Sequence, residues 1–96
     1  MSSFFTVRVE LHSSNYVSDF EKLHNAMGKE GFTRLIKDGT GKYYHLPRAE
    51  YSIYSEDSRP MILEKAKNAV ASTSKTAEIL VTESSGRTWD GLTEAK

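Results

Sequence analysis

The sequence contains no cysteine, so the chain forms no disulfide bonds, which is typical of cytosolic proteins. It also lacks any apolar run close to the roughly 18 to 20 residues that a membrane span needs. Residues 1–15 hold one basic side chain, Arg8, and no continuous apolar stretch of the kind found in secretory signals. These absences predict a soluble, cytoplasmic protein that makes no contact with membranes. A chain of 96 residues has room for one domain with one core.

The chain also lacks a net charge, because 13 lysines and arginines balance 13 aspartates and glutamates. Proteins that depend on phosphate contacts usually carry a clear positive excess. A role on nucleic acid would therefore require the cationic side chains to cluster locally. The neutral net charge thus counts against RNA binding without excluding it, and it favours a protein partner.

Six periodic segments are what the sequence does contain. Alternating apolar and polar residues predict strands, and apolar residues recurring every three or four positions predict helices. The strands are expected at residues 4–12, 32–37, 49–54 and 76–83, and the helices at 16–30 and 59–71. Ser13, Ser14 and Asn15 offer N-caps for the first helix, Gly31 can end it, and Ser58 can cap the second.

The order strand, helix, strand, strand, helix, strand predicts an α+β fold of the ferredoxin-like type, a two-layer sandwich. Right-handed crossovers would place both helices on one face of an antiparallel sheet with strand order 4-1-3-2. Residues 1–86 would form this single domain. Residues 87–96, with the only tryptophan, Trp89, form a tail that could lie on its own sheet edge, contact a second subunit or be flexible.

The face of this sheet opposite the helices would be open. Its expected outward residues are mostly charged or polar, which favours a solvated face with cross-strand ion pairs. An RNA-binding platform of the RRM type needs two or three outward aromatic rings on the central strands. Only Tyr54 is expected to provide one, so the sequence does not favour this type of platform. The expected outward residues are Arg8, Glu10, Arg34, Glu50, Ser52, Glu78 and Leu80.

Residues 5–54 contain a series of positions that follow one another in a recognisable order, nearly without gaps: Thr6, Val9, Ser13, Ser14, Tyr16, Phe20, Leu23, Met27, Phe32, Leu35, Ile36, Asp38, Gly41, Leu46 and Ile53. In these positions the chain resembles the GhoS family, whose members are small endoribonuclease antitoxins of type V toxin–antitoxin systems. The resemblance implies a ferredoxin-like fold and single-stranded RNA as the substrate. It also implies a regulatory role in the cytoplasm.

Cleavage of RNA without a metal needs a base, an acid and a cation or donor for the phosphorane charge. Histidine suits the first two roles near neutral pH. In the predicted fold, His12 shares a sheet edge with the hairpin tip at residues 38–48, which contains His45. We therefore expect His12 and His45 as the catalytic residues, although a surface histidine is more often simply solvated. The expected RNA-binding residues on the same tip are Lys42, Tyr43, Tyr44 and Arg48.

The three histidines show no HxH, HxxxH or HExxH spacing, so we expect no metal site and no cofactor. His24 adjoins the apolar Leu23 and is expected on a helix face without a catalytic role. Two functions remain open at this point. The first is a GhoS-type RNA-binding regulator or endoribonuclease. The second is a non-catalytic interaction module or inhibitor, dimeric through its open sheet edges and encoded by a mobile element.

Overall fold

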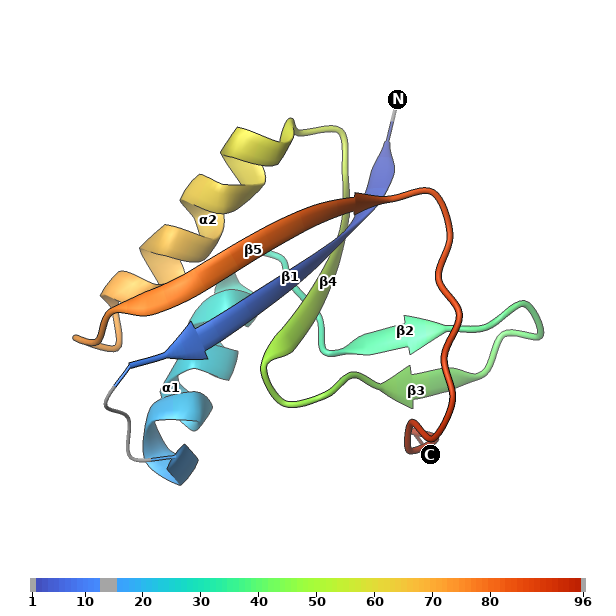
Figure 1. Ribbon diagram of the computed structural model, residues 1–96, viewed down its shortest axis with the longest axis horizontal. Helices are drawn as coiled ribbons and strands as arrows, with labels where there is room; N and C mark the ends of the chain where they lie inside the picture. Colours follow the sequence, from blue (N-terminus) through green and yellow to red (C-terminus); the bar gives the residue numbers. More distant parts are fainter. Residues whose placement is uncertain (1, 13–15, 96) are drawn as a thin grey trace.

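Two helices and five strands follow one another along the described part of the chain in the computed structural model, which covers residues 2–12 and 16–95 (Figure 1). Their bounds are β1 Ser3–Leu11, α1 Tyr16–Lys29, β2 Leu35–Lys37, β3 Tyr43–His45, β4 Glu50–Ser55, α2 Arg59–Ala71 and β5 Ala77–Ser84. The predicted α+β class, with two helices and a mostly antiparallel sheet, is confirmed.

The main sheet has the order β4-β1-β5, with β1 antiparallel to both neighbours. Alternation along β1 turns Phe5, Val7, Val9 and Leu11 to one face, where they are buried. Both helices cover this same face (Figure 1), because their apolar residues join the β1 side chains in one core. The opposite face of the sheet therefore carries no helix.

Local sequence explains where the helices end. Gly31, at φ 97°, follows α1, and the amide of Phe32 donates to the carbonyl of Met27 at 3.0 Å. The Gly31 amide donates to Gly28, which completes a Schellman motif. At the start of α2, the Ser58 side chain accepts from the Met61 amide at 3.4 Å. The expected caps Ser13, Ser14 and Asn15 lie outside the described residues.

The predicted strand order 4-1-3-2 does not appear as one four-stranded sheet. Among the described residues, the segment 32–37 pairs with β4 through one bridge, between Thr33 and Ser52, and β2 then pairs with β3 in a separate two-stranded sheet. The expected hairpin tip thus contains a strand. Asp38 closes the turn, since its Oδ1 accepts from the amides of Thr40 and Lys42. The Thr40 hydroxyl also donates to Asp38 and holds the pKa of that carboxyl below its usual value.

The C-terminal segment, residues 85–95, crosses in front of the small sheet and ends against β3 (Figure 1). Tyr44 and Glu94 form an antiparallel bridge. The His45 amide donates to Thr93 at 2.9 Å, and the ring centroid of Trp89 lies 5.6 Å from that of Tyr44. Of the three sequence-based alternatives for the tail, contact with its own fold is the one observed. Within residues 2–12 and 16–95, no helix has the length and apolar character needed to cross a membrane.

Candidate nucleic-acid interface

A hollow of about 760 Å³ opens on the helix-free side of the main sheet, and we call it the groove. The ends of β1 and β4 form its floor, the β2–β3 hairpin forms one wall, and the C-terminal segment forms the other. Its lining residues are Phe4, Thr33, Leu35, Ile36, Lys37, Asp38, Gly39, Tyr43, Ser52, Tyr54, Ser84, Ser85, Gly86, Arg87, Thr88 and Trp89.

Two aromatic rings stand on the floor of the groove. Phe4 of β1 and Tyr54 of β4 face each other across the strands, with ring centroids 4.6 Å apart. They remain 49% and 61% exposed, which is high for paired aromatic rings. The expectation that Tyr54 is the only outward aromatic ring on these strands is wrong, because Phe4 is a second one. Because Thr6 points outward, the period of two also turns Phe4 outward, and this signal was present in the sequence.

Two cationic side chains lie over aromatic rings of the groove lining. The Arg87 guanidinium carbon is 5.0 Å from the Phe4 ring centroid, and its Nη1 donates to the Ser52 hydroxyl at 3.1 Å. Burial lowers the pKa of Arg87. On the opposite wall, the Lys37 ammonium lies 5.8 Å from the Tyr43 ring centroid. The groove lining thus combines aromatic faces with two positive charges, Arg87 and Lys37, and one carboxylate, Asp38, which is held in the hairpin turn.

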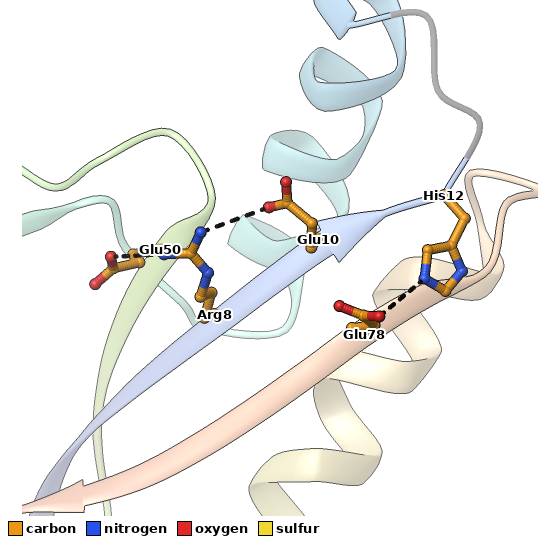
Figure 2. A network of polar contacts seen from close by, with 5 residues as sticks. All are labelled: Arg8, Glu10, His12, Glu50 and Glu78. Atoms are coloured by element: carbon orange, nitrogen blue, oxygen red, sulfur yellow. Dashed lines mark ion pairs between the residues drawn. The ribbon is translucent and has the colours of Figure 1, made fainter.

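The other end of the same sheet face is acidic (Figure 2). Arg8 lies between Glu10 of the same strand, at 3.9 Å, and Glu50 of β4, at 3.5 Å, and the second contact is a cross-strand ion pair of the predicted kind. Glu78 faces Glu10 across β1 and β5, and its carboxylate is 3.7 Å from His12 Nε2. These carboxylates repel phosphate groups. This end of the face is therefore unfavourable for an anionic ligand.

His12 and His45 do not come together. His12 follows the end of β1, where its Nδ1 is hydrogen-bonded to the Thr76 hydroxyl at 2.9 Å. His45 lies exposed on β3, which is well separated from that end of β1 (Figure 1). The prediction of a shared edge is wrong because the hairpin leaves the main sheet after Thr33. A shared role as acid and base on one phosphodiester would need the two imidazoles side by side, and the fold does not bring them together.

The four predicted RNA-binding residues are also dispersed. Tyr43, 48% exposed, lines the groove, and Lys42 is exposed at the hairpin turn. The Tyr44 hydroxyl donates to Asp38 at 3.3 Å, and its ring lies against Trp89. Arg48 lies on the helix side of the sheet, over Phe20 of α1. Tyr43 is thus the one member of this set among the groove-lining residues.

A histidine without an expected role has a strongly perturbed pKa. His24 of α1 is hydrogen-bonded through Nδ1 to the hydroxyl of Tyr51, a fully buried residue of β4. Burial, and then the positive charges of Arg34 and Arg48, lower the pKa of His24 to about 4. Burial raises the pKa of Tyr51. The Tyr51 hydroxyl therefore stays protonated and donates the hydrogen bond to His24 Nδ1. His24 is neutral at pH 7.

This neutral histidine predicts a loss of stability in mild acid. Unfolded chains bind a proton at the ordinary histidine pKa of 6.5, whereas folded chains bind it only near 4. The free energy of unfolding is therefore highest above pH 6.5 with respect to this group. It falls as the pH drops towards 4, by about 2 kcal/mol once solvent screening is allowed for. Urea unfolding at pH 7 and pH 4.5 measures the change. His24→Gln should remove most of this slope and His12→Gln should keep it; an equal slope in both variants would contradict the assignment.

Comparison of the chain with protein-family models and with curated proteins finds no match.

Proposed function

We propose that this protein binds single-stranded RNA in the groove. Phe4 and Tyr54 stack on two successive bases, and Arg87 and Lys37 contact the phosphates. The observation that carries the proposal is the outward aromatic pair on adjacent strands beside Arg87. Aromatic platforms with cations alongside bind unpaired bases, because each base has a face to stack and each linkage a negative charge.

The wider role that fits this activity is a small cytoplasmic RNA-binding regulator of the GhoS type, with a ferredoxin-like fold. The order β5-β1-β4, and the Thr33–Ser52 bridge on the outer side of β4, support the fold assignment. Cleavage by His12 and His45 is not part of the proposal, since their separation gives them no common substrate phosphate.

Direct binding tests the proposal. Fluorescence anisotropy should show that a labelled single-stranded RNA binds and that a duplex of the same sequence binds at least tenfold more weakly. Two phosphate contacts give a slope of about −1.4 for log affinity against log salt concentration. The double variant His12→Ala, His45→Ala should bind within about twofold of the unchanged protein. Equal affinity for the duplex, or no binding of RNA, would refute the proposal.

A protein partner or a second copy of the chain on the same sheet face is the second candidate function. Leu80 of β5 favours it, since this apolar side chain is 63% exposed on the groove side of the sheet. Light scattering at concentrations that saturate RNA separates the two. A dimer that dissociates when RNA is added would place both functions on this face, whereas a dimer that retains no RNA would favour the second candidate.

A further inference from the structure

Strand β5 forms one edge of the main sheet, and its outer side has no partner strand within residues 2–12 and 16–95 (Figure 1). It pairs with β1 in unbroken register from Ala77 to Ser84. Proteins usually protect a free edge with lysine, proline or a bulge, or keep the edge strand short. Residues 77–84 contain no lysine, arginine or proline, and the strand is eight residues long. This edge is therefore long, regular and open to pairing with another strand.

The backbone groups that this edge offers follow from the pairing with β1. Hydrogen-bonded and non-hydrogen-bonded residue pairs alternate along an antiparallel pair of strands. The His12 amide donates to the Thr76 carbonyl at 2.8 Å, so alternation turns the backbone groups of the even-numbered residues of β5 towards β1. On the other side of β1, the Val9 amide donates to Ala49, as the same alternation requires. The odd-numbered residues of β5 direct their amides and carbonyls outward: Ala77, Ile79, Val81 and Glu83.

Apolar side chains also reach this edge on both sides of the sheet. On the helix side, Val7 and Val9 of β1 are completely buried, whereas the residues opposite them, Val81 and Ile79, are only partly buried. On the other side, Leu80 is exposed in the middle of the strand. An added strand would cover this apolar surface and remove it from water.

A second copy of β5 matches the edge. Two copies related by a two-fold axis pair antiparallel, and their backbone groups meet only where outward-directed residues face one another. With the axis at Leu80, Ile79 pairs with Val81 of the second copy. The two Leu80 side chains then lie directly opposite each other as a non-hydrogen-bonded pair, the type in which side chains are closest.

The charges of β5 favour the same register. With the axis at Leu80, Glu78 faces Thr82 of the second copy, and Glu83 faces Ala77, so no carboxylate lies directly opposite a carboxylate. Moving the axis by one residue would instead place Leu80 opposite Glu78 or Thr82. The whole chain has no net charge, so no overall repulsion keeps two copies apart.

We propose that the protein forms a two-fold dimer in which β5 pairs antiparallel with β5 of a second copy, with Leu80 at the axis. The main sheets of the two copies become one continuous sheet with the order β4-β1-β5-β5-β1-β4. The groove lies on a face of the sheet rather than along its β5 edge. The dimer therefore does not depend on the RNA-binding proposal.

A charge at the axis tests the dimer. Sedimentation velocity over a concentration series should show a monomer–dimer equilibrium for the unchanged protein. Leu80→Lys places two ammonium groups opposite each other and should weaken the dimer at least about tenfold. Asn25→Lys adds the same charge on the exposed side of α1 and should change the dissociation constant by less than about twofold. A protein that is monomeric at every concentration, or equal weakening by both substitutions, would overturn the proposal.

A mixture of oppositely charged variants separates loss of the dimer from loss of the fold. Leu80→Glu alone should also be monomeric, because two carboxylates would meet at the axis. When it is mixed with an equal amount of Leu80→Lys, a heterodimer should form, since an ammonium group then faces a carboxylate. Amide spectra establish that each variant is folded. Folded variants that stay monomeric in the mixture would show that residue 80 does not lie at the axis.

Hydrogen exchange of the backbone amides locates the interface. In the monomeric Leu80→Lys protein, exchange should be slow at Glu78 and Thr82, which face β1, and fast at Ile79 and Val81, which face outward. In the dimer of the unchanged protein, Ile79 and Val81 should exchange slowly as well. A dimer in which these two amides still exchange fast would use another surface, contrary to the proposal.

Added RNA distinguishes the β5 edge from the sheet face. A short single-stranded RNA at saturating concentration should leave the dimer intact, because the edge and the groove are different surfaces. Dissociation of the dimer by RNA would place the second copy on the sheet face and rule out the edge contact. If no RNA binds, the groove proposal fails, and the variants and the exchange pattern still decide whether β5 pairs with its own copy.

Discussion

Replacing Phe4 and Tyr54 together with alanine should weaken the binding of single-stranded RNA about 100-fold. Stacking of one base on one aromatic side chain contributes roughly 1 to 3 kcal/mol by alanine substitution. Two rings in contact on adjacent strands offer two such platforms. Loss of both, at the lower part of that range, gives about 2.7 kcal/mol, which corresponds to a factor of about 100 in the dissociation constant.

The same substitutions should leave the fold in place. Both rings are on the outer face, about half or more exposed, and neither belongs to the core. Their mutual contact contributes about 1 kcal/mol to stability, a loss that urea unfolding would register as a small shift in midpoint. Affinity and stability are then affected to very different degrees.

Leu80→Ala is the matched control for this prediction. Leu80 is exposed on the same sheet face, but it faces Arg8 near the acidic end rather than the groove. Its removal should change RNA affinity by less than about twofold, because a base near Glu10 and Glu78 would meet carboxylates. RNA bound equally well by the double variant, or lost equally in Leu80→Ala, would show that the aromatic pair is not the platform.

The long periodic elements were predictable because each is specified by its own residues. β1 alternates over nine residues, and α1 repeats apolar positions at helical spacing and ends at Gly31. The short hairpin was not predictable in the same way. A strand of three residues such as β2 has too little pattern to select its neighbouring strand. β2 pairs with β3 rather than β4 because the turn that Asp38 closes brings β3 beside it.

The candidate site was predicted in part for the same reason. Tyr43 was expected at an RNA surface and does line the groove, whereas the His12–His45 pair depended on a hairpin that turns elsewhere. Arg87 and Trp89 lie beyond the last periodic segment. Their positions result from backbone bonds between residues 93–95 and β3, and no local pattern in the sequence reports such distant pairing.

Tyr51→Ala should destabilise the protein by about 4 kcal/mol, the largest effect on folding that we expect. Tyr51 is completely buried between Val7 of the neighbouring strand and His24 of α1. Its removal leaves a cavity in the core and leaves the His24 Nδ1 acceptor without its donor. In a domain of this length the loss should lower the melting temperature by roughly 15 to 30 °C.

Tyr54→Ala is the control for this change, since it truncates the same residue type three positions along β4 on the exposed face. It should cost only about 1 kcal/mol. Tyr51→Phe keeps the ring and removes the hydroxyl, so it should cost about 1 to 2 kcal/mol through the lost hydrogen bond. That cost should shrink in a His24→Leu background, where the acceptor is absent as well. Thermal melts of these variants, of His24→Leu and of the unchanged protein measure the losses. Equal losses for Tyr51→Ala and Tyr54→Ala would mean that Tyr51 does not hold α1 against the sheet.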